Sequence, residues 1–387
     1  MRARRTRFAA VAVASALAFG IAGSSAALAD DGSAADPAAA SASPASLLGA
    51  SVTAGADGSY TVRWTGVLAY GQVDVYASTD SRDPKGTGTK VASSRTGSAV
   101  VSGLDPAKRW YFVVAPAGGS YSVETATRGV GVQGALNTRD LGGYRTSNGR
   151  TVKYGEVFRS DSFGKATDAG VAKLAGLGLD AVYDFRVTGE IGSNGPNRLP
   201  AGVDSRSVPL SDGGVLATVV AAVSSGDPVK QQEMLGDGKA QKFMEDVNRS
   251  FVNDPAKRAE FSEVLKAVAS GDRVAFNCSA GKDRTGWMAA TLLTALGVDR
   301  GTVYTDYLAS NDYLKPSIDA TINGMVASGA LQNPELVRPL LGVQTSYLDA
   351  GFDEVRKVYG SFDNYLRNGL GIDSLTLAKL KLRLLSV

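Results

Sequence analysis

The chain has 387 residues, of which 41 are Lys or Arg, 38 are Asp or Glu, one is Cys and none is His. The absence of histidine excludes serine–histidine–acid triads, histidine general bases and histidine metal ligands. A single cysteine also excludes an intrachain disulfide and a zinc ribbon.

The N-terminus has the pattern of a secretory signal. Four arginines within the first seven residues precede an apolar run, Phe8 to Gly23, and the small residues Ala27-Leu28-Ala29. This order predicts a signal peptide over 1–29 and a secreted protein, and the short, Ala- and Gly-rich run disfavours the alternative of a membrane anchor. Removing four arginines from 41 basic residues leaves 37 against 38 acidic ones, so nothing suggests nucleic-acid binding.

Two segments follow the signal. Residues 30–46 are mostly Ala, Ser, Asp and Pro, which predicts a disordered linker. Residues 47–127 contain short alternating runs separated by Gly, Asp and Pro, which predict a small all-β sandwich. The runs are Tyr60–Trp64, Val73–Tyr76, Ala99–Val101 and Trp110–Val114. The stretch from Leu104 to Tyr111 resembles the corner of a fibronectin type III domain, with Trp110 in place of its tyrosine. We expect this module to act as a spacer or in adhesion, with its aromatic residues in the core rather than on a sugar-binding surface.

From 128 to 387 strand and helix patterns alternate, which predicts one α/β domain with a central sheet flanked by helices. Leu179 to Phe185 reads as a buried strand, and a helix begins after Asp254 and ends before Gly271. Residues 212–252 have helical character broken by glycines and could form a lid. The amphipathic stretch 375–385 is expected to pack as a terminal helix rather than to contact a membrane.

The decapeptide 277–286, Asn-Cys-Ser-Ala-Gly-Lys-Asp-Arg-Thr-Gly, lies between a predicted strand and a predicted helix. The helix N-terminus carries about half a positive charge and free N–H groups, so it favours an anion. It also favours the thiolate of Cys278, which is the nucleophilic form. The alternative is an inert buried cysteine. A nucleotide P-loop is excluded because Phe276 and Asp283 stand where it needs glycine and a hydroxyl residue.

The surroundings of Cys278 favour phosphate chemistry. Small residues at 279–281 allow backbone N–H groups to converge on one point. Arg284 offers a planar fork for two phosphate oxygens, and Thr285 can place a hydroxyl near the sulfur. The predicted phosphate-binding residues are Ser279, Ala280, Gly281, Lys282, Asp283, Arg284 and Thr285.

The decapeptide resembles the signature of the cysteine-dependent tyrosine phosphatases, and its Ala-Gly-Lys-Asp-Arg-Thr-Gly ending resembles their bacterial branch. Other segments resemble the same family in the same order. They are 137–144 (Asn-Thr-Arg-Asp-Leu-Gly-Gly-Tyr), 157–160, 184–186 with Glu190, 306–311 and 365–371. The resemblance covers about residues 130 to 387. It implies a cysteine-phosphatase fold that needs no metal or other cofactor.

One position departs from the family pattern. The family usually has histidine before the cysteine, where this chain has Asn277. An amide can donate a hydrogen bond but carries no charge, so we expect a working nucleophile that is less strongly stabilised as the thiolate.

The resemblance implies two chemical steps on Cys278, with Arg284 and loop N–H groups holding the phosphoryl oxygens. A carboxylic acid must protonate the leaving group. Asp283 is the first candidate, unless it serves as an ion pair with Lys282, and Asp184 is the second. Arg139, Asp140, Arg159 and Arg186 are expected to brace the cleft more than to contact substrate.

We therefore expect an exported phosphatase that acts on phosphotyrosine, with phosphoserine, phosphothreonine or phosphoinositides as further substrates. Its partners are phosphoproteins or phosphoinositides, with no nucleic acid and no stable membrane insertion. The alternative is a phospho-ligand binding protein on the same scaffold whose turnover is weak or lost through Asn277.

Overall fold

The computed structural model describes residues 46–67, 71–119 and 121–386. The predicted signal peptide (1–29) lies outside the described residues, and so does the predicted linker (30–46) except for Ser46. Within the described part of the chain, no helix has both the length and the apolar character needed to cross a membrane.

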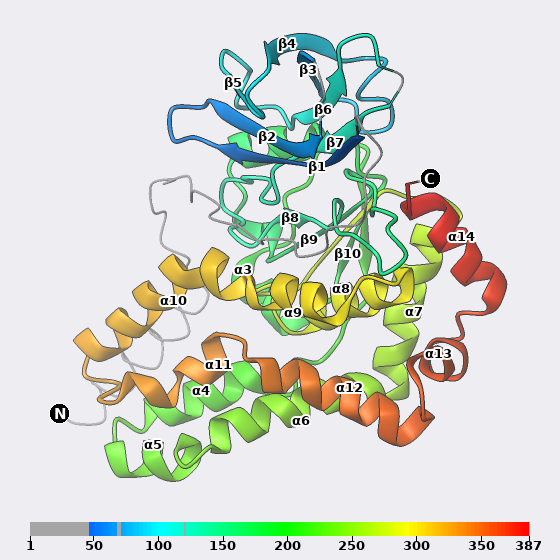
Figure 1. The fold of residues 1–387 in the computed structure, drawn as a ribbon. Coiled ribbons are helices and arrows are strands. Elements are labelled where there is room, and N and C mark those ends of the chain that lie inside the picture. Colours follow the sequence, from blue (N-terminus) through cyan, green and yellow to red (C-terminus); the bar gives the residue numbers. More distant parts are fainter. Residues whose placement is uncertain (1–45, 68–70, 120, 387) are drawn as a thin grey trace.

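Seven strands form two antiparallel sheets at one end of the molecule (Figure 1). One sheet has the order β1-β2-β5 and the other β4-β3-β6-β7. Their bounds are β1 Ser46–Ala54, β2 Tyr60–Val67, β3 Val73–Ser78, β4 Thr89–Ser94, β5 Ser98–Val101, β6 Tyr111–Pro116 and β7 Val123–Thr125. Both sheets contribute to one apolar core that includes Val62, Trp64, Val75 and Phe112. Trp110 lies just before β6, and its indole N–H donates to the carbonyl of Asp105 (2.8 Å).

The second part of the chain is built on a five-stranded sheet with the order β11-β10-β12-β9-β8. The strands are β8 Arg139–Asp140, β9 Val157–Ser160, β10 Ala181–Asp184, β11 Asp204–Ser207 and β12 Val274–Asn277. All neighbours are parallel except β8, which runs antiparallel to β9. The register aligns Asp184, Asn277 and Ser160 at the carboxyl ends of three adjacent strands. Ligands of open α/β sheets bind beyond this edge, so the segments that follow these strands define the site.

Alternation along the strands buries both faces of this sheet. Phe158, Val182 and Ala275 pack on one side with Leu174. Tyr183 and Phe276 belong to a larger cluster on the other side, with residues of the following helices. The mixed α/β architecture predicted from the sequence is confirmed, because helices cover a central sheet.

Helices make up most of the rest of the described residues after 140 (Figure 1). The helices are η1 Phe163–Lys165, α2 Asp168–Ala175, α3 Thr188–Asn194, α4 Val215–Ser224, α5 Pro228–Leu235, α6 Lys239–Asn253, α7 Pro255–Ser270, α8 Arg284–Leu296, α9 Arg300–Leu308, α10 Ser310–Ala327, η2 Pro334–Leu336, α11 Arg338–Leu341, α12 Thr345–Tyr359, α13 Phe362–Asn364, the π-helical turn η3 Tyr365–Gly369 and α14 Ser374–Leu384. Helix α7 begins where the sequence predicts, since the Asp254 carboxylate accepts the N–H of Ala256 (2.9 Å). Helix α14 packs on α7 through buried Leu380 and Leu384, as expected of a terminal helix.

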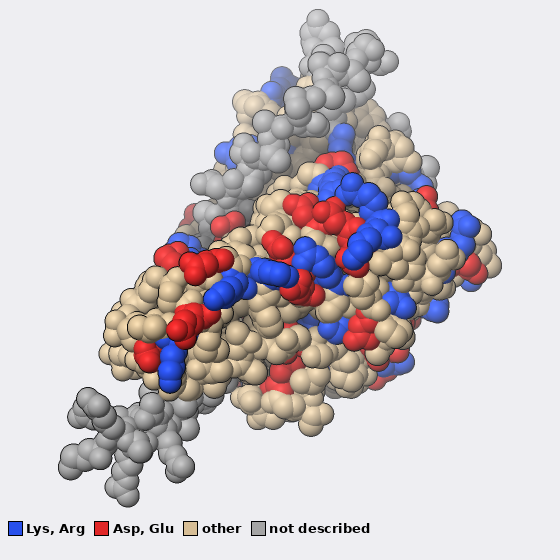
Figure 2. Space-filling view, turned by 90° about the horizontal axis from the view of Figure 1, so that it is seen from below, with Lys and Arg blue, Asp and Glu red and all other residues tan. Residues whose placement is uncertain are grey.

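The face opposite β1–β7 carries charges of both signs. Figure 2 looks onto this face and shows blue and red side chains intermixed over the described residues. On α6, Asp246 pairs with Lys242 (2.8 Å) and with Arg249 (2.7 Å). Over the described residues of this face, opposite charges therefore alternate without a broad patch of one sign.

Candidate active site

Residues 278–283 connect the carboxyl end of β12 to the N-terminus of α8, as the sequence predicts. Cys278 is buried, with 3% of its surface exposed, and its Sγ accepts the N–H of Gly281 (3.2 Å). The loop therefore curls around the sulfur and directs a backbone donor at it. This arrangement favours an anion bound above the sulfur.

Gly281 is essential to this curl. Its φ is +68°, and a Cβ at this position would lie 2.4 Å from the carbonyl oxygen of Ser160. A side chain is therefore excluded twice, by the backbone conformation and by contact with the end of β9. The loop is pressed directly against a neighbouring strand.

Side chains outside the loop hold its carbonyl groups. The Asn137 amide donates to the carbonyls of Ala280 (2.9 Å) and Gly281 (3.1 Å), and Arg159 Nη2 donates to that of Gly281 (2.8 Å). Carbonyls that point toward these donors leave the N–H groups of the loop free to face an anion.

These braces rest on a buried charge cluster. Asp306 on α9 pairs with Arg139 Nε (3.0 Å) and Arg159 Nη1 (2.5 Å), and it accepts the Tyr144 hydroxyl (3.0 Å). Burial would raise the pKa of Asp306, but the two guanidinium groups hold it well below its usual range. Arg139 and Arg159 are fully buried, so the structure places them in bracing roles.

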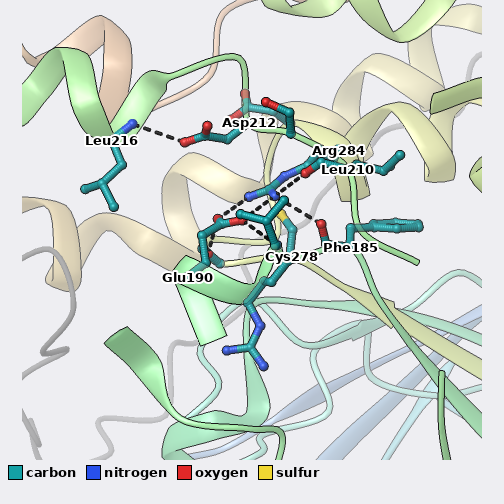
Figure 3. A network of polar contacts seen from close by, with 12 residues as sticks. Phe185, Glu190, Leu210, Asp212, Leu216, Cys278 and Arg284 are labelled. Carbon is teal, nitrogen blue, oxygen red and sulfur yellow. Dashed lines mark hydrogen bonds and ion pairs between the residues drawn. The ribbon is translucent and has the colours of Figure 1, made fainter. Parts of the chain in front are cut away.

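Arg284, the first residue of α8, is held by a carboxylate (Figure 3). Its Nη1 and Nη2 donate to the two oxygens of Glu190 (2.7 and 2.6 Å), and Nη1 also donates to the carbonyls of Phe185 (3.1 Å) and Leu210 (2.8 Å). No described residue accepts a hydrogen bond from Nε, so the edge formed by Nε and Nη2 can serve a phosphate. Burial lowers the pKa of Arg284, but the charges of Cys278 and Glu190 raise it overall.

Glu190 fixes two parts of the loop at once. It also accepts the Ser279 hydroxyl (2.5 Å) and the N–H of Val187 (3.0 Å). Burial would raise the pKa of Glu190, but the bonds from Arg284 lower it overall, so the carboxylate is ionised. Glu190 lies in one of the segments that resemble the family, but no role is predicted for it from the sequence.

The two predicted acids lie in different environments. Asp283 lines the site cavity, where its Oδ2 pairs with Lys282 (2.8 Å) while its Oδ1 is buried without a hydrogen-bond partner among the described residues. Asp184 instead pairs with Arg186 (2.7 Å) and accepts the Asn197 amide (3.2 Å), and it is not among the described residues that line the cavity. The structure therefore brings Asp283, but not Asp184, to the cavity.

Asn277 belongs to the same network as Asp184. It is fully buried, and its Oδ1 accepts the amide of Asn197 (3.1 Å). The Oδ1 of Asn197 in turn accepts Arg186 Nη2 (3.0 Å) and the N–H of Phe163 (3.0 Å). Asn277 is thus held by the neutral amide of Asn197, which is itself held by the ion pair of Asp184 and Arg186.

A further carboxylate was not predicted. Asp161 follows β9 and lines the cavity, where its two oxygens accept the N–H groups of Leu136 (3.1 Å) and Asn137 (3.0 Å). Burial raises the pKa of Asp161 to about 6 although these hydrogen bonds lower it. The sequence did contain a signal for Asp161, because this residue follows a strand that lies parallel to β12. The carboxyl ends of neighbouring parallel strands meet at the same edge of the sheet.

The cavity has a volume of about 930 Å³ and two kinds of wall. The polar wall includes Cys278, Arg284, Asp161 and Asp212, and Figure 3 shows Asp212 beside Arg284. The apolar wall comes from α4, α6, α10 and α11. Its residues are Val215, Leu216, Val219, Val247, Phe251, Leu314, Ile318, Leu340 and Leu341. Helices α4 and α6 belong to the segment 212–252, for which a lid stays a prediction.

The chain was compared with known proteins. The sequence pattern described as the tyrosine phosphatase family matches residues 130–386. The triple specificity protein phosphatase PtpB of Mycobacterium tuberculosis is 31% identical over 271 residues, covering 64% of this chain and 96% of that protein. A Cupriavidus necator protein, provisionally named a tyrosine-protein phosphatase, is 34% identical over 240 residues, covering 61% and 82%. The crystal structure of P. aeruginosa TpbA aligns with a TM-score of 0.25 and 16% identity over 47% of this chain and 91% of that chain, too little to carry an argument.

We predict that Gly281→Ala lowers hydrolysis of p-nitrophenyl phosphate by about 100-fold, because a loop displaced by about 1 Å loses its alignment with the phosphate. The control is Gly297→Ala at the other end of α8, where φ is +89° and nothing lies within 4 Å of an added Cβ. Both variants carry backbone strain, and only Gly281→Ala adds a contact with the end of β9. A lower rate in Gly281→Ala alone, measured at a temperature where both variants are folded, supports the prediction. Equal rates in the two variants contradict it.

Proposed function

Because the chain belongs to the tyrosine phosphatase family and is a protein-tyrosine phosphatase, we propose that it hydrolyses phosphate monoesters through a covalent intermediate on Cys278. The observation that supports this most directly is the loop itself. A buried sulfur, a converging backbone N–H and a guanidinium with one open edge lie in one cavity.

In the first step, the Cys278 thiolate attacks phosphorus in line, a sulfur–phosphorus bond forms and the bond to the leaving oxygen breaks. The leaving oxygen takes a proton from a carboxylic acid. Loop N–H groups and the Nε–Nη2 edge of Arg284 hold the three remaining oxygens, whose charge develops in the transition state. In the second step, water attacks phosphorus, the sulfur leaves as thiolate and the acid's conjugate base takes the proton.

The substrate range proposed is phosphotyrosine first, with phosphoserine, phosphothreonine and phosphoinositides as further substrates. One relative carries three specificities in its name, which supports a broad range. The cavity also offers space beyond the phosphate cradle, since its volume is near the upper end for small-ligand sites. Lys282 lines that space as an additional positive charge.

We also propose the architecture expected from the sequence, with a fibronectin type III-like module over 47–127 and the phosphatase over 128–387. Two antiparallel sheets around a shared core support the module. The corner hydrogen bond of Trp110 supports the same assignment, because it joins the strand to the preceding loop as a corner tyrosine does.

We predict that Cys278→Ser abolishes turnover of p-nitrophenyl phosphate and leaves affinity for phosphate within a few-fold, because a serine hydroxyl is not ionised near neutral pH. Wild-type enzyme quenched in acid during turnover should carry one phosphate on Cys278, detected by peptide mass spectrometry. Full activity of Cys278→Ser would rule out this nucleophile. A wild-type protein that binds phosphate without turnover would favour the phospho-ligand binding alternative.

We predict that Asp283→Asn lowers kcat by about 100-fold on phenyl phosphate and much less on p-nitrophenyl phosphate, because only the poorer leaving group needs the proton. Asp184→Asn is the matched control and should affect both substrates alike through stability.

The pH–rate profile separates Asp283 from Asp161. The pKa of Asp161 is raised to about 6, so this group holds a proton to donate below that pH and loses it above. If the fall in rate near pH 6 disappears only in Asp161→Asn, the acid is Asp161 and the assignment to Asp283 is wrong.

We propose export through residues 1–29, on the arginine-rich start, the apolar run and the small residues at 27–29. The expected product is a protein in the culture medium whose N-terminal peptide begins at Asp30, which mass spectrometry can identify. An active protein confined to the cytosol with Met1 or Arg2 at its start would refute export.

A further inference from the structure

Arg109 crosses from the N-terminal sheets into the phosphatase part of the chain. It lies in the loop before β6 and is buried, with 3% of its surface exposed. Its Nη2 pairs with Asp140 Oδ2 (3.3 Å), and both side chains are almost completely buried. Its Nη1 donates to the Thr127 hydroxyl (2.6 Å) and to the carbonyl of Gly129 (3.1 Å). A charge buried in this way is fixed in position by its partners.

Asp140 links Arg109 to the central sheet. It is the second residue of β8, and its carboxylate also accepts the N–H groups of Gly142 (2.8 Å) and Gly155 (2.9 Å). These three donors tie together the turn after β8, the segment before β9 and the N-terminal sheets. Strand β8 has only two residues and lies at the edge of its sheet, so it depends on contacts of this kind for its position.

The residues next to Asp140 hold the loop at 278–283, which is the proposed phosphate-binding loop. Arg139 precedes it in β8 and is paired with Arg159 in the register of β8 and β9. Both arginines bind Asp306, and Arg159 also donates to the carbonyl of Gly281. Asn137, just before β8, holds the carbonyls of Ala280 and Gly281. A shift of β8 would therefore displace two of the groups that orient the loop.

We propose that Arg109 is a positioning residue for catalysis, which acts through Asp140 and β8 on the loop that binds phosphate. The N-terminal sheets then form part of the catalytic unit and are more than a spacer. This inference rests on the proposed function, because its main readout is hydrolysis.

The test compares Arg109→Met with Lys173→Met in the full chain. Lys173 on α2 also crosses between the two parts, since its Nζ donates to the carbonyls of Pro106 (2.9 Å) and Lys108 (2.6 Å), but it has no contact with Asp140. Arg109→Met should lower kcat for p-nitrophenyl phosphate about tenfold, with a smaller change in KM. Lys173→Met should lower the melting temperature and leave kcat within about twofold.

A double-mutant cycle with Asp140→Asn adds a readout that general destabilisation would not produce. If Arg109 acts through Asp140, the double variant should lose little more kcat than either single variant. Arg109→Lys keeps the charge but cannot reach Asp140, the Thr127 hydroxyl and the Gly129 carbonyl together. It serves if the Met variant does not fold, and it should lose about half as many orders of magnitude in kcat.

Wild-type kcat in Arg109→Met or Arg109→Lys, equal loss in Lys173→Met, or additive effects in the cycle would each overturn the inference while the proposed function stands. A wild-type protein without any hydrolysis would overturn both.

Discussion

Two buried arginines share one buried carboxylate, and the loop at 278–283 depends on this arrangement. Arg139 and Arg159 come from adjacent strands and meet at Asp306 of α9, so three segments far apart in the sequence are joined by charge. Removing one partner from a buried pair costs about 3–5 kcal/mol, because the other charge is left without compensation. The role of this cluster is to fix the positions of the side chains that it joins. It fixes Arg159 where its Nη2 reaches the carbonyl of Gly281 (2.8 Å).

The same logic explains how the site manages without a histidine before the cysteine. Asn277 is held by Asn197, and Asn197 is held in turn by Asp184 and Arg186. An amide pair can fix the backbone behind Cys278 as firmly as a ring can, but it brings no positive charge. The positive charge near the sulfur comes from Arg284 and from the start of α8. The departure at 277 therefore affects the electrostatics around the Cys278 sulfur more than the shape of its loop.

The sequence was sufficient for the parts of the site that are local. A strand, a loop of small residues and a helix are encoded within 278–286 and its flanks, so Cys278 and Arg284 could be placed before the structure. What required the structure were contacts between segments far apart in the chain. Asp184 was a candidate because it ends a strand at the correct edge, yet Arg186 two residues later pairs with it. Asp161 follows β9, the strand on the other side of β12, and lines the cavity. Strand order and side-chain direction determine which of these two carboxylates reaches the cavity, and neither can be inferred from spacing alone.

The fold places polar, ion-paired elements and apolar helices around the sulfur of Cys278. On one side, β8, β9 and the N-terminal sheets are linked by buried ion pairs that tolerate little displacement. On the other, α4 and α6 contribute aliphatic side chains to the cavity, and Leu216 is partly exposed at its wall. Apolar contacts are non-directional, so this wall can shift or receive groups of different shape without breaking specific bonds. In the reaction proposed above, the rigid polar side would fix the phosphate and the apolar wall would leave the rest of the substrate less constrained. Selectivity among phosphate esters would then depend on the apolar wall, because each of them presents the same three oxygens to Arg284 and the loop N–H groups.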